Sequence, residues 1–161
     1  LAGENRPKEI STFDEVNVGL TQSICDAVRA TGRKIPLIFA SSTWANYLDN
    51  PYGKSKRDAE LVLDLLSKEV GNSVSIYRFS GIFGKWCKPN YNSVVATFCY
   101  NIVRDIPINI NNSEAILNLV YIDDVIKEFI NIMDNLEKRI ETKKFKSITP
   151  LYQITVGDQE L

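Results

Sequence analysis

Segments with helical spacing alternate with short apolar runs along this chain of 161 residues. Helices with one apolar face are predicted near residues 13–31, 51–70, 92–103 and 123–136. Strands are predicted at residues 36–40, 74–79 and 116–120, and residues 151–154 are expected to be extended. The continuously apolar run at 36–40 is typical of a strand covered on both faces. Because helices between strands allow parallel pairing, this order predicts an α/β fold with a parallel sheet and helices on its faces.

The helix boundaries have local signals. The first helix is predicted to place Phe13, Val16, Leu20, Ile24 and Ala27 on its buried face and to end at Gly32. Asn50 is predicted to cap the second helix, with Pro51 in its first turn and Gly71 closing it. Asp123 or Asp124 is predicted to cap the helix that runs to about Leu136. Residues 108–110 are expected to be extended, and residues 156–158 resemble the start of a further helix.

The two ends of the chain suggest a fragment. Residues 1–3 would be the tail of a strand, and residue 161 would lie inside a helix. The sequence contains no Gly-x-Gly-x-x-Gly or Gly-x-x-Gly-x-x-Gly segment. We therefore expect one partial domain, residues 1–161, that continues a larger fold.

Composition excludes several kinds of chemistry. The chain has no histidine, so it contains no Ser-His-Asp or Cys-His catalytic set, and we expect no metal site. Its 19 basic and 20 acidic residues nearly cancel, which gives no reason to expect nucleic acid as a partner. Apolar runs are far shorter than a membrane span of roughly 20 residues, so membrane insertion is not expected. Three cysteines without Cys-x-x-Cys spacing indicate free thiols in a reducing cytoplasm.

Tyr52 and Lys56 lie four residues apart in the first turns of the second predicted helix, which places them on one face. A phenol has an unperturbed pKa of about 10, and a neighbouring ammonium favours the phenolate and lowers that pKa. This pair could therefore serve as an acid–base group. The same spacing is also common in surface pairs without a function.

Polar segments follow several predicted strands. Ser41, Ser42 and Thr43 follow the strand at 36–40, where α/β sheets bind ligands, although serine clusters also occur in ordinary turns. The segment from Arg78 to Gly84 follows the next strand. The loop from Lys85 to Ser93 carries two lysines and leads into a helix N-terminus, which suits a diphosphate. A polar connecting loop would look the same.

These segments, in this order, resemble the extended short-chain dehydrogenase/reductase family, also called the epimerase/dehydratase family. The resemblance is carried by Ser41-Ser42 before Pro51-Tyr52-Gly53-Lys54-Ser55-Lys56, by Arg78 to Gly84, by Ile122 to Val125, and by Asn17 before Val18-Gly19-Leu20-Thr21. It implies the C-terminal portion of a Rossmann-like doubly wound parallel sheet, without the glycine-rich first βαβ half. A closer resemblance, carried by residues 2–7, 77–94 and 96–100, is to reductases of capsular polysaccharide synthesis.

The resemblance implies roles for particular residues. Tyr52 would protonate a carbonyl oxygen, Lys56 would hold the nicotinamide ribose, and Ser42 would polarise the carbonyl. The implied cofactor-binding residues are Ala2, Gly3, Ser41, Tyr52, Lys56, Phe79, Ser80 and Ile82. The implied substrate-binding residues are Ser42, Thr43, Lys85, Lys88, Asn90, Tyr91, Asn92 and Ser93.

The implied activity is NADPH- or NADH-dependent reduction of the C4 ketone of a UDP-2-acetamido-2,6-dideoxy-hexos-4-ulose by a longer protein of which this chain is a part. Alternatives are a nucleotide-sugar 4-epimerase or dehydratase, and a non-catalytic dinucleotide-sensing module. A nucleotide-activated sugar is the expected partner, and the family's helical contact implies a homodimer. The isolated chain is expected to bind a dinucleotide poorly, because the phosphates would have no glycine-rich helix N-terminus.

Overall fold

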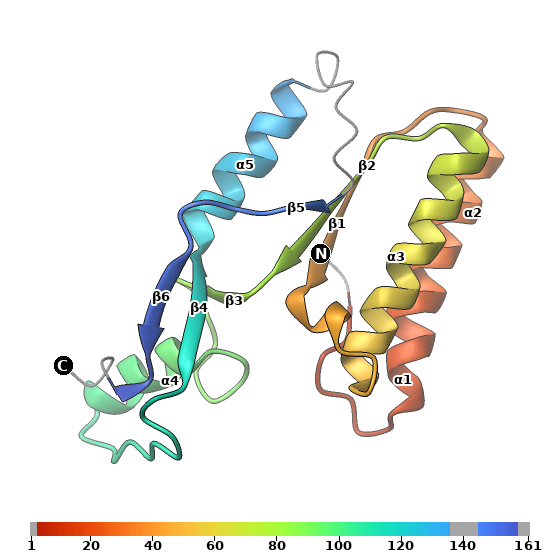
Figure 1. Ribbon diagram of the computed structural model, residues 1–161. Helices are drawn as coiled ribbons and strands as arrows, with labels where there is room; N and C mark the ends of the chain where they lie inside the picture. Colours follow the sequence, from red (N-terminus) through yellow and green to blue (C-terminus); the bar gives the residue numbers. More distant parts are fainter. Residues whose placement is uncertain (1–2, 136–144, 158–161) are drawn as a thin grey trace. The chain divides into compact units, whose positions relative to one another are not determined.

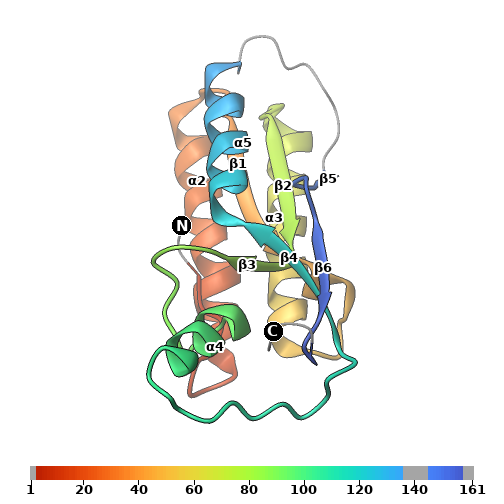
Figure 2. The ribbon, with the colours of Figure 1, turned by 90° about the vertical axis from the view of Figure 1, so that its left-hand side faces the viewer.

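A computed structural model describes residues 3–135 and 145–157. The chain divides into two compact units, the first containing residues 3–79 and 145–147 and the second containing residues 80–135 and 148–157. Each is described by itself below (Figures 1 and 2). The expectation of one partial domain stays a prediction.

The first unit packs a parallel sheet against a pair of helices. The sheet has the strand order β1-β2-β5 with both pairs parallel, and α2 and α3 lie side by side (Figure 1). Its elements are α1 (Ser11–Phe13), the π-helical turn η1 (Asp14–Gly19), α2 (Leu20–Thr31), β1 (Leu37–Ser42), the 3₁₀ turn η2 (Thr43–Asn46), α3 (Pro51–Val70), β2 (Val74–Phe79) and β5 (Phe145–Lys146).

The core of this unit lies between α2, α3 and β1. Cys25 and Val28 of α2 meet Leu63 and Leu66 of α3, and Leu37, Phe39 and other apolar residues pack around them. Both helices end on a glycine in the left-handed region, Gly32 with φ 65° and Gly71 with φ 76°. Glycine adopts this conformation without a Cβ penalty, so the predicted helix ends are confirmed.

The buried face of α2 differs from the predicted one. Thr21, Cys25 and Val28 point inward, whereas Leu20 is 37% exposed and Ile24 is 45% exposed. The apolar spacing predicted that Leu20, Ile24 and Ala27 face inward, and each is the residue just before one that is buried in the structure. Polar residues occupy the inner face because they are hydrogen-bonded there: Thr21 Oγ1 donates to the Asn17 carbonyl at 2.7 Å.

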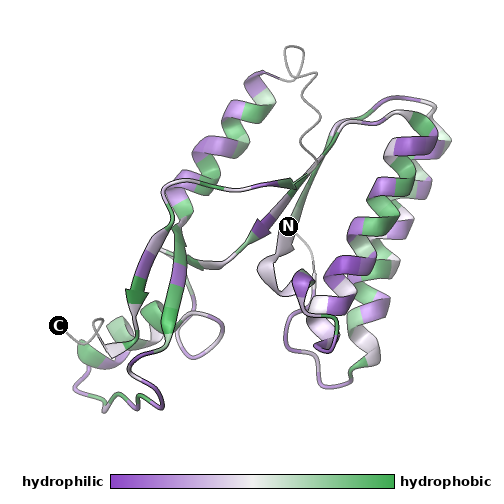
Figure 3. Cartoon of the chain, in the orientation of Figure 1, coloured by the Kyte–Doolittle hydropathy of each residue, from purple (hydrophilic) through white to green (hydrophobic). Residues whose placement is uncertain are grey.

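The second unit is built on a three-stranded sheet with the order β3-β4-β6. β3 and β4 are parallel, but β4 and β6 are antiparallel, so the prediction of parallel strands fails for this pair. The helix α5 alternates hydrophobic and hydrophilic residues along its length (Figure 3). The elements are β3 (Gly81–Phe83), α4 (Val94–Ile102), β4 (Ile116–Tyr121), α5 (Ile122–Asp134) and β6 (Tyr152–Thr155).

One local prediction in this unit is wrong. The N-cap of α5 is Tyr121, and Asp123 and Asp124 instead lie in its first turn, where carboxylates interact favourably with the helix dipole. Residues 108–110, expected to be extended, have no assigned helix or strand, so that expectation stays a prediction. The short strands β3 and β5 were not predicted. Leu136, the predicted end of the helix that begins near Asp123, and Asp158, the last residue of the predicted helix start at 156–158, lie outside the described residues.

Within the described ranges, no helix combines the length and apolar character needed to cross a bilayer. The same residues contain no cluster of three or more metal-ligating side chains.

Candidate active site

Tyr52 lies at the start of α3, where the predicted cap is present. Asn50 Oδ1 accepts a hydrogen bond from the Gly53 amide at 3.0 Å, and Pro51 occupies the first turn. A capping side chain satisfies an amide that has no partner inside the helix, so it fixes where α3 begins. Tyr52 is thereby held half-buried in the first turn, with its ring 5.8 Å from that of Phe13.

Lys56 is 8% exposed and points toward the end of β1. Its Nζ donates to the Ala40 carbonyl oxygen at 3.2 Å and lies 5.2 Å from the ring centroid of Phe39 and 5.9 Å from that of Tyr52. Burial lowers the pKa of Lys56, and the negative charge of Glu60 opposes this shift. The ammonium is therefore close to the phenol ring but is also held by the strand backbone.

The pKa of Tyr52 is raised, mainly by burial, while hydrogen bonding with the Ser42 side chain lowers it. This net direction is the reverse of what Lys56 alone would produce. The physical reason is that a phenolate at a half-buried position loses hydration. The phenol consequently keeps its proton at neutral pH and is suited to donate it.

The serines after β1 have separate partners. Ser42 is 8% exposed, caps η2 by accepting from the Trp44 amide at 3.2 Å, and hydrogen-bonds Tyr52. Ser41 is 4% exposed and donates its hydroxyl to Glu60 Oε1 at 2.6 Å. Thr43, the first residue of η2, is exposed. The structure thus brings Ser42, Tyr52 and Lys56 together at the carboxyl end of β1.

Gly3 and Asn17 border the same place. Asn17, in the π-helical turn η1, donates Nδ2 to the Glu4 carbonyl at 2.9 Å and to Ser55 Oγ at 3.0 Å, and its Oδ1 accepts from the Glu4 amide at 2.8 Å. A Cβ at Gly3 would lie 3.1 Å from Asn17 Oδ1 and 3.5 Å from Lys56 Nζ. The backbone therefore passes close to Lys56 at a position where a side chain would press on it. Ala2 lies outside the described residues.

Phe79 ends β2 beside Ser42, its register partner across the parallel pair. It is 8% exposed, and its ring stacks on that of Tyr77 at 5.8 Å. Phe79 therefore lies at the same strand ends as Ser42.

The remaining predicted residues belong to the second unit. Ile82 is half-buried in β3, and the buried hydroxyl oxygen of Ser80 has no hydrogen-bond partner among the described residues. In the loop that follows, Lys85 Nζ pairs with Asp123 at 3.2 Å, and Lys88 Nζ lies 5.7 Å from the ring centroid of Tyr91. The Lys85 pKa is raised by its hydrogen bond to Asp123.

The end of this loop is ordered around α4. The Asn90 amide donates to Thr97 Oγ1 at 2.9 Å, and Ser93 caps α4 by accepting from the Ala96 amide at 3.2 Å. Asn92 is exposed just before the cap. Asn90 has φ 54° and Trp86 has φ 69°, two non-glycine residues in the left-handed region.

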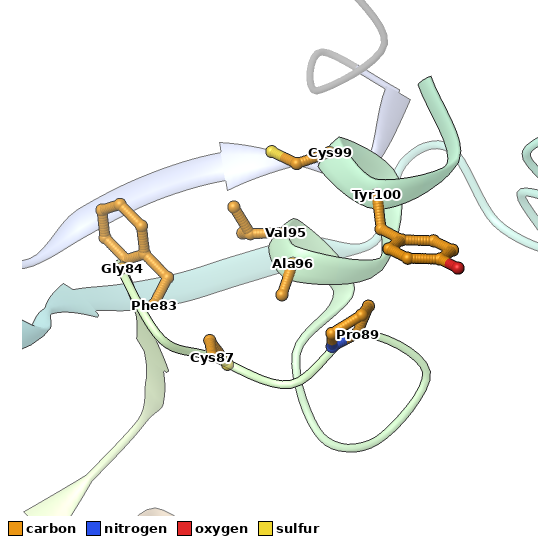
Figure 4. A pocket seen from close by; sticks show the side chains of 8 residues that line it. All are labelled: Phe83, Gly84, Cys87, Pro89, Val95, Ala96, Cys99 and Tyr100. Carbon is orange, nitrogen blue, oxygen red and sulfur yellow. The ribbon is translucent and has the colours of Figure 1, made fainter. Parts of the chain in front are cut away.

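A hollow of about 350 Å³ lies between this loop and α4 (Figure 4). Sequence reasoning did not identify it, because its wall combines loop and helix residues that have no common spacing. It is lined by Phe83, Gly84, Cys87, Pro89, Val95, Ala96, Cys99 and Tyr100.

A buried ionic cluster at the end of β1 was also missed. Glu60 is 1% exposed and binds Ser41, Arg57 and Arg78. The sequence does place Glu60 four residues after Lys56, on the face of the helix that is predicted to be buried. Because a buried charge without a partner is unfavourable, this position could have indicated a buried ion pair.

Comparison with known proteins places this geometry in a family. The profile of the NAD dependent epimerase/dehydratase family matches residues 3–146, which is most of the chain. The chain belongs to this family. The fold class and the family predicted from the sequence motifs are thereby confirmed.

Within this epimerase/dehydratase family, the chain is 50% identical over 158 residues to the UDP-2-acetamido-2,6-beta-L-arabino-hexul-4-ose reductase of Pseudomonas aeruginosa; the match covers 98% of this chain and 41% of that protein. The capsular polysaccharide assembling protein CapF of Staphylococcus aureus superposes with a TM-score of 0.74 at 36% identity over 86% of this chain and 38% of that one. The chain therefore spans about two fifths of the length of these relatives.

A more distant solved structure shares the fold. The UDP-glucuronic acid 4-epimerase of Bacillus cereus, solved in complex with NAD, superposes with a TM-score of 0.82 at 18% identity, covering 97% of this chain and 54% of that one. This likeness adds to the assignment of the fold.

Proposed function

We propose that the longer protein that carries this chain, called the parent protein below, reduces the C4 ketone of a UDP-2-acetamido-2,6-dideoxy-hexos-4-ulose with NADPH or NADH. The product would be a precursor of capsular or other surface polysaccharide. The observation that carries the proposal is the convergence of Ser42, Tyr52 and Lys56 at the end of β1. The 50% identity to a reductase of this type supports the substrate class.

Each of the three side chains has a proposed role in the reduction that agrees with its environment in the structure. Reduced nicotinamide, when bound, supplies the hydride that reaches C4. Tyr52 donates its phenolic proton to the carbonyl oxygen, and its raised pKa means that this proton is present at neutral pH. Ser42 donates a hydrogen bond to the same oxygen, and the Lys56 ammonium stabilises the resulting phenolate.

The binding residues are proposals as well. Gly3, Lys56 and Phe79 of the first unit would hold the nicotinamide end of the cofactor, with the backbone at Gly3 lying close to Lys56. Ser41 would contribute through its backbone, because its hydroxyl is donated to Glu60. Ser80 and Ile82 of the second unit are further proposed cofactor-binding residues. Thr43 and the loop residues Lys85, Lys88, Asn90, Tyr91, Asn92 and Ser93 would contact the sugar nucleotide, the two lysines supplying positive charge for its diphosphate.

The proposal is tested by incubating the parent protein with the 4-ketosugar nucleotide and either reduced nicotinamide. We expect one nicotinamide to be oxidised for each ketone consumed. Conversion of a nucleotide sugar without net nicotinamide oxidation would instead identify a 4-epimerase or dehydratase, the alternative that the family description favours. Cofactor binding without any turnover would indicate a sensing module.

We expect Lys56→Met in the parent protein to weaken nicotinamide binding and to lower kcat by roughly 100-fold, because a buried cation is removed from beside the phenol. Steady-state kinetics and nicotinamide fluorescence measure the two effects. Lys54→Met is the matched control, since Lys54 lies two residues earlier on α3 but is exposed and pairs with Asp58. A loss of thermal stability with kinetics unchanged would contradict a catalytic role.

We also propose that the parent protein is a homodimer. Leu20 and Ile24 of α2 and Leu61 and Leu65 of α3 are each between 37% and 52% exposed, and the two helices pack against each other. An apolar surface on adjacent helices favours burial against another chain. Light scattering is expected to give twice the mass of the parent chain, and a monomer would contradict the proposal.

A further inference from the structure

Glu60 is a carboxylate buried beside the proposed acid–base group, with 1% of its surface exposed. Both of its oxygens are occupied: Oε1 accepts from Ser41 Oγ at 2.6 Å and from Arg78 Nε at 2.8 Å, while Oε2 accepts from Arg78 Nη2 at 2.6 Å and from Arg57 Nη1 at 3.1 Å. Burial alone would raise the pKa of Glu60, but the hydrogen bonds from Arg78 and Ser41 outweigh it and the net direction is down. Glu60 is therefore a charged, fully paired group.

Arg78 joins this carboxylate to the loop before α3. Its Nε and Nη2 form a fork on Glu60, and its Nη1 donates to Asn46 Oδ1 at 2.6 Å. Two parallel hydrogen bonds between planar groups fix their relative orientation as well as their separation. Through Arg78, the fork connects β2 and α3 to η2, the turn that Ser42 caps.

The end of β1 is held from α3 at two successive residues. Lys56 donates to the Ala40 carbonyl at 3.2 Å, and Glu60, one helical turn later, accepts from Ser41 at 2.6 Å. The next residue is Ser42, which accepts from the Trp44 amide and hydrogen-bonds Tyr52. The direction of the Ser42 side chain is thus set by a strand end that Glu60 fastens.

We propose that Glu60 is a positioning residue: held in the Arg78 fork, it fixes β1 through Ser41 so that the Ser42 hydroxyl faces the Tyr52 phenol. The expected effect on turnover rests on the proposed function. The orientation of the Ser42 hydroxyl by Glu60 and Ser41 does not depend on the substrate. A displacement of about 1 Å at a catalytic group lowers turnover by roughly 100-fold. An ion pair at the protein surface, by contrast, contributes little to the free energy of unfolding.

The kinetic test compares Glu60→Gln, Ser41→Ala and the double variant in the parent protein. Ser41→Ala removes only the link to β1 and leaves the ion pair in place, so it remains informative where Glu60→Gln fails to fold. We expect either single variant to lower kcat by roughly 10- to 100-fold with KM for both substrates nearly unchanged. The double variant should be no slower than Glu60→Gln, because Ser41 acts through Glu60 and the two changes lie on one chain of contacts.

Glu69→Gln is the matched control, since Glu69 is also on α3 and also pairs with an arginine, Arg29, but at the surface. It should leave kcat unchanged. Wild-type kcat in both Ser41→Ala and Glu60→Gln would overturn the proposal, as would a rise in KM for the nicotinamide with kcat unchanged.

A second measurement separates this inference from the proposed function. The Trp44 amide is bonded to Ser42 Oγ, so its hydrogen exchange in parent protein labelled with ¹⁵N-tryptophan reports the position of that hydroxyl without any substrate. We expect faster exchange in Ser41→Ala than in the wild type, with the Trp86 amide unchanged as the internal reference. Unchanged exchange at Trp44 would overturn the positioning role, even where the parent protein reduces the ketone normally.

Discussion

We expect Tyr52→Phe in the parent protein to lower kcat for ketone reduction by roughly 100- to 10,000-fold, the usual contribution of a positioned proton donor. Phenylalanine keeps the ring, which packs 5.8 Å from Phe13, and removes only the hydroxyl that hydrogen-bonds Ser42. Nicotinamide binding should stay nearly intact, because Lys56 and the strand backbone that holds it are unchanged. Single-turnover kinetics and nicotinamide fluorescence measure the two quantities separately.

Tyr47→Phe is the control for this substitution. Tyr47 is 58% exposed, follows η2, and makes an edge-to-face contact with the ring of Trp44. It should turn over at the wild-type rate. Wild-type turnover in Tyr52→Phe would remove Tyr52 from the role of proton donor.

The second large effect is expected at Gly53, the residue after Tyr52. A Cβ there would lie 2.5 Å from the Tyr47 carbonyl oxygen and closer still to that of Trp44. Both neighbours are backbone atoms, which cannot rotate away as a side chain can. We expect Gly53→Ala to destabilise the first unit by about 3 kcal/mol or more, at the upper end for overpacking. Because the clash separates η2 from α3, turnover should fall as well.

Gly19→Ala provides the comparison, since Gly19 is also helical, with φ −62°, and its nearest contact for a Cβ is at 3.8 Å. Alanine there should stabilise the protein by roughly 0.5–1 kcal/mol. Differential scanning calorimetry of both variants measures the contrast. Equal unfolding temperatures for Gly53→Ala and the wild type would show that η2 does not need to lie against the start of α3.

The sequence predicts the first unit better than the second for a physical reason. Helix α3 has an Asn50 cap, a proline in its first turn and a terminal glycine, and these local signals act within a few residues. The antiparallel pairing of β4 with β6 joins residues more than thirty positions apart, and nothing local encodes its direction. β3 and β5 contain only three and two residues, too few for a periodic pattern.

The candidate site was predictable where it rests on spacing. Tyr52 and Lys56 are one turn apart, and Ser42 follows a predicted strand, so their convergence follows from the topology. The face of α2 was misassigned because buried Asn17 and Thr21 form hydrogen bonds that hydrophobic periodicity does not register. Glu60 was overlooked for the same reason: its burial depends on Arg78, eighteen residues later on another element.

The most direct test of the central claim is the fate of a label on the reduced nicotinamide. The parent protein is incubated with NADPH carrying two deuterium atoms at C4 and with the 4-ketosugar nucleotide, and the product is analysed by NMR. We predict one deuterium at C4 of the sugar and one oxidised nicotinamide for each product molecule. A product without deuterium at C4, formed with no net oxidation of the nicotinamide, would contradict the account and indicate an epimerase or dehydratase.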